Sequence, residues 1–238
     1  MELEKRRRLI VFVAALVGAL LTARLGLWQL HRAAEKIAKQ QAVEVQGRLP
    51  AVDAAALGPA TKNRRVLLRG RWLADRTVLL DNRPMNGQPG FYVLTPLQLE
   101  GRADAVVVQR GWVPRNQLDR TQVPPFATPD GLVQLEGRIM DGPPRLYEFR
   151  PSGPGPIRQN LDLAAYAQEI HHSLLPVAVL ETDAPADGLR RDWPAPDLGL
   201  QMHYGYAVQW FALCALMVGL YVWFQLLKPR RGTRDDGA

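Results

Sequence analysis

The chain ends in a long apolar stretch, His203 to Leu227 (HYGYAVQWFALCALMVGLYVWFQLL), which carries no formal charge from Tyr204 onward. A transmembrane helix needs roughly 20 predominantly apolar residues, so this stretch is long enough to cross a bilayer. A second apolar run, Leu9 to Leu30, lies near the other end of the chain. The two runs predict two membrane-spanning helices with one domain between them.

The net charge of +7 is concentrated in basic segments at 5–8 and 228–234, which flank the two apolar runs. Basic residues beside a span mark its cytoplasmic end. The pattern therefore places both termini in the cytoplasm and the central domain outside it. That domain is nearly balanced in charge, which removes the main argument for binding nucleic acid.

The first run also has the basic start and apolar core of a secretory signal peptide. No small-x-small cleavage pattern follows it, so we expect an uncleaved anchor in a bacterial inner membrane. The single cysteine, Cys214, lies in the second run, so the domain is predicted to have no disulfide. The expected organisation is a cytoplasmic N-terminus (1–8), a span (9–30), a periplasmic domain (31–203), a second span (204–227) and a basic cytoplasmic tail (228–238).

Small residues recur every four positions along the first run, at Ala14, Gly18, Thr22 and Gly26. Such a stripe allows a second helix to approach closely. Ala215 and Gly219 have the same spacing in the second run, so we expect the two spans to pack against each other. Arg24 and Trp28 lie off this stripe. They are interpreted either as a snorkelling cation with an interfacial tryptophan or as a contact with another membrane protein.

Between the runs, residues 30–45 are compatible with a continuation of the first helix, and the periodicity then changes. In RRVLLRGRW the alternate residues Val66, Leu68, Gly70 and Trp72 follow the two-residue period of a half-buried strand. The other expected strands are 77–82, 91–97, 105–112, 132–139 and 176–181. A short helix at 161–170 with Asn160 as its N-cap, loops at 113–131 and 140–159, and a linker at 182–201 complete the prediction. Short strands at this spacing predict a mainly antiparallel β domain, a small barrel or sandwich.

The domain carries no familiar hydrolase or nucleotide-binding motif: G-x-S-x-G, H-E-x-x-H, the P-loop and G-x-G-x-x-G do not occur. The remaining nucleophile and base candidates are Ser152 or Ser173 with His171 and His172. Adjacent histidines of this kind are more typical of a surface than of a site. We therefore expect no catalytic residue, and no structural zinc site either.

Three arginines lie near the dense stretch DNRPMNGQPGFYVLTPLQ and the following VVVQRGWVPRN. Arg83, Arg110 and Arg115 are interpreted as parts of a hairpin whose core holds Phe91 and Trp112. The alternative is that they bind an anionic group, because a guanidinium offers a bidentate fork to carboxylate or phosphate.

His203 stands at the edge of the second run, where an ionisable side chain is by default a functional hypothesis. Neutral imidazole is a common axial ligand of haem iron. Tyr206 and Trp210 follow at i+3 and i+7, so a flat aromatic ligand could stack beside them. All three residue types are equally typical of the interfacial belt, and the residues alone leave both interpretations open.

Four motifs occur together and in order: LGLWQLHRAAEKI, PGFYVLTPL, VVQRGWVPRN and HYGYAVQWFA. This set resembles the Surfeit-locus assembly factors of cytochrome c oxidase over nearly the whole chain, with the same two-span topology. IRQNLDL and DGLRRDWPAPD resemble the bacterial branch of that family.

The resemblance implies a non-enzymatic factor that binds haem a transiently and assists its delivery to the catalytic subunit of the oxidase, with the haem a biosynthesis enzymes as further partners. His203 matches the histidine proposed in the family as the haem-iron ligand, and Tyr206 and Trp210 would then be packing surfaces. Gly70 and residues 110–114 match signature positions to which we assign a structural role.

His31 is not carried over as a second ligand, because we know of no family requirement for histidine in its segment. The alternative function is a cofactor-free membrane scaffold that stabilises an oxidase subunit during assembly. In that case the domain and the face with Arg24 and Trp28 would hold the subunit.

Overall fold

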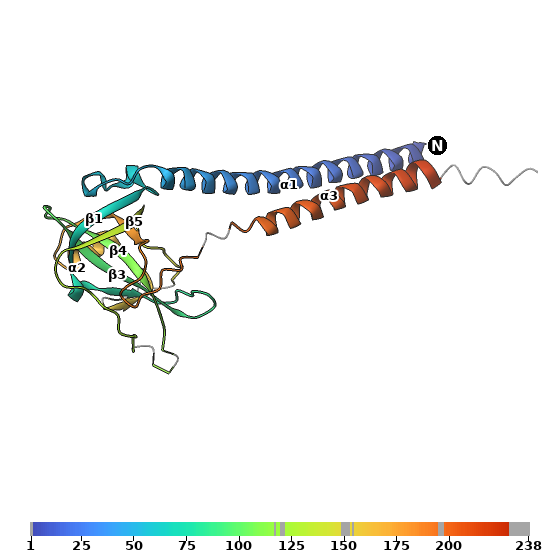
Figure 1. Cartoon of the computed structure of the whole chain (residues 1–238). Coiled ribbons are helices and arrows are strands. Elements are labelled where there is room, and N and C mark those ends of the chain that lie inside the picture. The colour runs from blue at the N-terminus through green and yellow to red at the C-terminus, as the bar shows by residue number, and fades with distance from the viewer. Residues whose placement is uncertain are drawn as a thin grey trace, which may run out of the picture. The chain divides into compact units, whose positions relative to one another are not determined.

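The computed structural model describes residues 2–116, 118–119, 122–148, 153, 155–194 and 198–228. Ser152 and the basic tail beyond Lys228 lie outside this range. The chain forms two compact units, residues 1–41 with 196–238 and residues 42–195 (Figure 1). The helices and strands are α1 (Glu2–Arg48), η1 (Ala54–Ala56), η2 (Pro59–Thr61), β1 (Arg65–Trp72), η3 (Ala74–Arg76), β2 (Val78–Leu80), β3 (Gly90–Leu99), β4 (Ala105–Pro114), β5 (Val133–Met140), β6 (Ile157–Arg158), α2 (Leu163–Glu169), β7 (Leu174–Glu181), α3 (Leu200–Tyr221) and η4 (Val222–Leu227).

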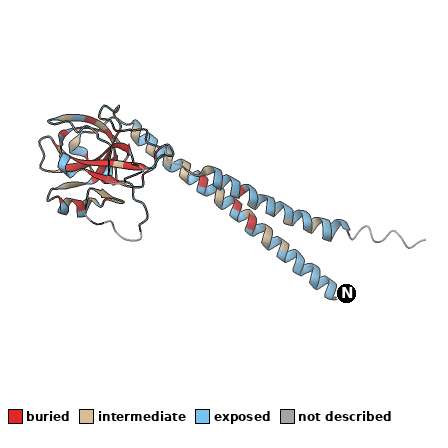
Figure 2. Ribbon diagram, turned by 90° about the horizontal axis from the view of Figure 1, so that it is seen from below, coloured by how far each residue is buried: buried red, intermediate tan, exposed pale blue. Residues whose placement is uncertain are grey.

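The two apolar runs form α1 and α3, and both helices are long and apolar enough to cross a membrane by length and composition. α1 runs without a break to Arg48, which confirms that the first helix continues beyond its apolar part. α3 begins at Leu200, four residues before the expected start of the span, and a π-helical turn, η4, follows it. Most of their side chains are exposed (Figure 2), as expected for helices whose outer faces meet lipid.

α1 and α3 meet along a seam with the spacing of a coiled coil. The contacts occur in opposite order along the two helices: the Phe12 and Tyr221 ring centroids lie 5.6 Å apart, and the Cys214 Sγ donates to the Ala19 carbonyl at 3.4 Å. The alternation of three- and four-residue steps keeps one stripe of each helix facing its neighbour. From His203 onward, the residues of α3 that are at least partly buried are His203, Ala207, Trp210, Cys214, Met217 and Tyr221.

The small-residue stripe of α1 is confirmed at three of its four positions. Thr22 and Gly26 are buried and Gly18 is partly buried, whereas Ala14 is exposed. A Cβ added at Gly18 would lie 2.7 Å from the Met217 sulfur, so this glycine permits the close approach.

The prediction that Ala215 and Gly219 form the matching face of α3 was wrong. Both are exposed, and nothing lies within 4 Å of a Cβ placed at Gly219. A strict four-residue spacing drifts about 40° per step around a helix of 3.6 residues per turn. The seam instead follows the mixed spacing of Ala207, Trp210 and Cys214.

The second unit contains a closed five-stranded barrel. β1 pairs with β5, β5 with β7, β7 with β4, β4 with β3, and β3 returns to β1. β1 changes partner at Gly70, which pairs with Val133 of β5 and with Leu99 of β3. A Cβ at Gly70 would lie 2.2 Å from the Gln98 carbonyl oxygen, so closure at this point requires glycine. The strand spacing left a small barrel and a sandwich open, and the pairing of β3 with β1 makes the domain a barrel.

The barrel interior is filled by the inward-facing residues of its five strands, and other apolar clusters cover part of its outer surface. Alternation along β1 places Val66 and Leu68 inside. α2 covers the outer face of β2, β3 and β4 through Tyr166 and Ile170. β4 is consequently buried on both faces, which explains the apolar run Ala105–Val108 at its start.

Three details differ from the sequence prediction. The sheet is mainly antiparallel, as expected, but β4 pairs with β7 and β2 with β6 in parallel, and these two pairings were not predicted. The two-residue strand β6 lies in a segment expected to be a loop. The N-cap of α2 is Asp162, whose carboxylate accepts from the Ala164 and Ala165 amides, and not Asn160. Asn160 instead pairs its side-chain amide with the backbone of Leu146.

Candidate functional site

His203 lies in the first turn of α3, where a left-handed residue, Gly199, begins the helix. The Lys36 ammonium donates to the Leu198 carbonyl at 2.8 Å and ties this turn to α1. The His203 ring is partly buried, and its Nδ1 lies 2.7 Å from the Oε1 of Gln29. Within the part of the chain that the structure describes, the other ring nitrogen, Nε2, makes no hydrogen bond.

The aromatic neighbours of His203 differ in their surroundings. Trp210 is partly buried on the seam with His203, two turns further along α3. Tyr206 is 52% exposed and lies at the edge of the seam. The structure therefore places the imidazole and the indole on one stripe and leaves the phenol at its border. Their role in holding a ligand stays a prediction.

His31 lies on a different face of α1 from Gln29. It borders an outward-facing groove of about 690 Å³, which is lined by Leu21, Arg24, Leu25, Leu27, Trp28 and His31. Arg24 and Trp28 are exposed and off the seam, as their helical positions predicted. Arg24 has no ion pair or hydrogen bond with any described residue. His31 therefore does not lie on the seam between α1 and α3, where His203 lies.

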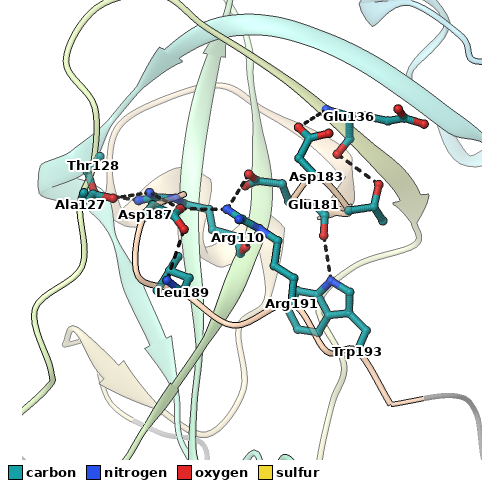
Figure 3. Close-up of polar contacts among 11 residues, drawn as sticks. Arg110, Ala127, Thr128, Glu136, Glu181, Asp183, Asp187, Leu189, Arg191 and Trp193 are labelled. Atoms are coloured by element: carbon teal, nitrogen blue, oxygen red, sulfur yellow. Dashed lines mark hydrogen bonds and ion pairs between the residues drawn. The ribbon is translucent and has the colours of Figure 1, made fainter. Parts of the chain in front are cut away.

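Arg110 is buried inside the domain, and both terminal nitrogens of its guanidinium make hydrogen bonds. Its guanidinium donates to the Thr128 hydroxyl and the Ala127 carbonyl, both at 2.7 Å, and to the Asp187 carboxylate at 3.1 Å (Figure 3). The Arg110 Cζ also lies 4.7 Å from the centroid of the Trp72 ring, which is a cation–π contact. Burial lowers the pKa of Arg110, and Asp187 opposes this effect. This arginine holds the fold together and is not available to a ligand.

A second arginine extends the cluster. The Arg191 guanidinium donates to Glu181 at 2.7 Å and to Asp187 at 2.8 Å, so two carboxylates share one cation. Glu181 is only 7% exposed, and its second carboxylate oxygen has no hydrogen-bond partner among the described residues. Burial raises the pKa of Glu181 to about 7, with Asp187 adding to the rise and Arg191 opposing it. A cavity of about 270 Å³ lies beside these groups.

The same cluster fixes the segment that follows β7. Arg190 and Trp112 exchange backbone hydrogen bonds at 2.8 and 2.9 Å, and the Arg190 guanidinium lies 4.9 Å from the Trp112 ring centroid. The Trp193 indole donates to the Glu181 carbonyl at 2.8 Å. Residues 187–193, expected to be linker, are therefore a strap bonded to the barrel. The structural role predicted for 110–114 agrees with this arrangement.

Of the other two arginines of the dense stretch, Arg83 is internal and Arg115 is partly buried. Arg83 is buried and donates to the Pro144 and Gln159 carbonyls at 2.9 and 2.8 Å, while its own carbonyl accepts from the Trp112 indole at 2.6 Å. Burial lowers the Arg83 pKa. Arg115 lies 3.6 Å from Asp81. The geometry favours the hairpin interpretation over an anion site.

The serine and histidine candidates are not assembled into a nucleophile–base pair within the described part of the chain. The His172 Nε2 lies 2.6 Å from the Gln98 amide oxygen, and the Ser173 carbonyl accepts from the Ala105 amide. His171 adopts a left-handed conformation at the end of α2, with φ of 52°.

Sequence reasoning missed two features of the site. The Gln29 contact with His203 had a visible signal, a polar residue among apolar ones in LGLWQLHR. The grouping of Arg110, Glu181 and Arg191 had none, because β4 and β7 are far apart in the sequence and meet only as neighbours in the barrel.

The chain was compared with known proteins. The SURF1 family model matches residues 16–215. A SURF1-like protein of Drosophila melanogaster is 27% identical over 233 residues, covering 87% of this chain and 74% of that protein. A SURF1-like protein of Rickettsia bellii is 26% identical over 231 residues, covering 92% of each chain. Another, from Rickettsia felis, is 26% identical over 210 residues, covering 83% of this chain and 89% of that protein. Because this match covers most of the length of the chain, from the first third of α1 into α3, the chain belongs to the SURF1 family.

Proposed function

We propose that this protein is an assembly factor of the haem–copper cytochrome c oxidase, which binds haem a and assists its delivery to the catalytic subunit. The observation that carries the proposal is the state of the His203 ring: Nδ1 contacts Gln29, and Nε2 has no partner among the described residues. Haem a, when bound, would supply an iron that a neutral imidazole nitrogen can ligate. His203 would be that ligand.

The surroundings of His203 fit a flat, largely apolar group. Trp210 shares its stripe, and the exposed ring of Tyr206 adds aromatic surface at the border. The buried arginines of the domain, Arg83 and Arg110, are engaged by carbonyls and by Asp187 and are poor partners for haem propionates. The protein holds and positions the cofactor in this proposal and performs no catalysis itself.

The proposal places α1 and α3 in a bacterial inner membrane, as two antiparallel spans on either side of the domain in the sequence. Basic residues at 5–8 and at Lys228 mark the cytoplasmic ends of the two helices. Both termini are then cytoplasmic and the barrel is periplasmic. The catalytic subunit and the haem a biosynthesis enzymes are the proposed partners.

The test is to purify the full-length protein from a haem a-producing bacterium in mild detergent and record its pyridine haemochrome spectrum. We expect haem a with the wild type, loss of most of it with His203→Ala, and retention with His31→Ala. The His31→Ala variant is a matched control, because it also removes one imidazole, but from a face of α1 that does not contact His203. A wild type without haem a, or a His203→Ala variant with as much haem as the wild type, overturns the ligand assignment.

A second candidate is a cofactor-free scaffold for an oxidase subunit. It is favoured by Arg24, a cation in the apolar part of α1 with no partner in the described chain, beside the exposed Trp28. Ionisable residues within spans often mark a contact with another group in the membrane. The scaffold predicts that the subunit co-purifies equally with wild type and His203→Ala, and that neither preparation absorbs in the Soret region.

A further inference from the structure

One polar side chain contacts His203 from the opposite helix. Gln29 lies on the α1 seam between two buried small residues, Gly26 and Ala33. Its amide oxygen lies 2.7 Å from the His203 Nδ1, within the range of a good hydrogen bond. Because both side chains are partly buried, the contact is sheltered from competing water.

The chemistry of the pair determines which ring nitrogen carries the proton. A carbonyl oxygen can only accept a hydrogen bond. With the Gln29 oxygen turned toward the ring, the contact is a hydrogen bond when the neutral His203 carries its hydrogen on Nδ1, which leaves the lone pair on Nε2. In the part of the chain that the structure describes, nothing else bonds to Nε2.

We infer that Gln29 is a positioning residue that fixes the tautomer and ring orientation of His203 and so keeps Nε2 available as a ligand atom. Residues that accept the second ring N–H of a ligating histidine play this role in many metal sites. The use of Nε2 by haem iron rests on the proposed function. The tautomer of His203 does not depend on the proposed function, because the hydrogen bond with Gln29 lies within the protein and involves no cofactor.

A simple packing role for the same contact makes a different prediction. A hydrogen bond between two membrane helices also favours their association, whichever group donates it. If that were its only role, either tautomer would serve, because the Gln29 amide could turn and donate to Nδ1 instead. The protonation pattern of the ring therefore separates the two roles.

The first experiment uses the full-length haem-free protein in micelles, with histidine labelled with ¹⁵N in the ring. Long-range ¹H–¹⁵N correlation spectra are recorded at about pH 9, well above the ordinary imidazole pKa of about 6.5. We expect the wild-type His203 to be protonated on Nδ1. Gln29→Leu should shift the ring towards the Nε2–H form, and Gln29→Glu, which keeps an acceptor, should preserve the Nδ1–H form.

Gln209→Leu is the matched control, because Gln209 is exposed on α3 and lies off the seam. It should leave the His203 signals unchanged. A wild-type ring protonated on Nε2, or a tautomer that does not respond to Gln29→Leu, overturns the inference. His203→Ala assigns the signals by removing them.

The second experiment measures haem a binding by absorbance titration of the same variants. Loss of a supporting hydrogen bond typically weakens metal binding by about 10–100-fold. We expect that loss with Gln29→Leu and its recovery with Gln29→Glu. If the wild type shows the Nδ1–H tautomer but binds no haem a, the proposed function fails while the positioning role stands. If haem binds through His203 equally well in wild type and Gln29→Leu, the positioning role fails while the proposed function stands.

Discussion

Replacing Glu181 by glutamine is expected to stabilise the domain at neutral to alkaline pH. Glu181 is 7% exposed, one of its carboxylate oxygens has no partner among the described residues, and it shares Arg191 with Asp187. These surroundings raise the pKa of Glu181 from an ordinary 4.5 to about 7. One pKa unit corresponds to about 1.4 kcal/mol, so the difference amounts to about 3 kcal/mol.

The sign follows from proton linkage. Between about pH 4.5 and about pH 7 the folded protein holds the Glu181 proton more tightly than the unfolded chain does, so stability falls as the pH rises. The contribution is fully present below about pH 4.5 and is lost above about pH 7. Glutamine carries no charge at any pH, so the Glu181→Gln variant should lack this loss and be up to about 3 kcal/mol more stable than the wild type near pH 8.

The assay is urea unfolding of the full-length chain in micelles at a series of pH values, followed by tryptophan fluorescence. Trp72 and Trp193 border the cluster and report on it. Glu100→Gln is the control, because that carboxylate is half-exposed and 3.5 Å from Arg69, and such surface pairs are worth about 0–1 kcal/mol. The reasoning is refuted if Glu181→Gln lowers the urea midpoint near pH 8, or if the two curves keep a constant separation across the whole pH range.

Two glycine substitutions test the packing of the two units separately. Gly70→Ala places a Cβ 2.2 Å from a backbone carbonyl oxygen of β3 and should lower the free energy of unfolding of the barrel by about 1–3 kcal/mol. Gly58→Ala is the control, because a Cβ at that position meets nothing within 4 Å. Equal urea midpoints for the two variants would contradict the account of barrel closure. Gly26→Val would crowd the Phe211 ring, 2.8 Å from a Cβ at that position, and should lower the thermal midpoint of the helix pair measured by far-ultraviolet circular dichroism. Gly219→Val, on the open face of α3, should leave the thermal midpoint unchanged. An equal fall in the midpoint with this variant would contradict the assignment of the seam.

The strands were predictable because their signals are local. Alternation in RRVLLRGRW located β1, and turn residues bounded β3 and β4 within a few positions. The closure of the barrel was not predictable, because it depends on pairing between β1 and β5, which no short window of sequence contains. The parallel pairing of β4 with β7 could not be predicted for the same reason.

The candidate site was predictable in part. His203 was prominent because a titratable residue at the end of an apolar run is costly, whereas Gln29 was overlooked because amides are common near membrane surfaces. The wrong face of α3 was chosen since Ala215 and Gly219 matched the spacing of α1, although small residues also tolerate lipid. Asn160 was predicted as the N-cap of α2 in place of Asp162 because both residue types are good N-caps and the sequence does not separate them.

The position of β7 has a consequence for the order in which the chain folds. β7 is the last strand in the sequence, yet it lies between β5 and β4 in the ring. Until residues 174–181 have emerged from synthesis, both of those strands expose an unpaired edge, and such edges are prone to pair with other chains. Closure also waits for contacts between distant parts of the sequence, which slows folding. A nascent chain halted before β7 would therefore depend on a chaperone to cover these edges, and the arrival of the final strand would end that dependence.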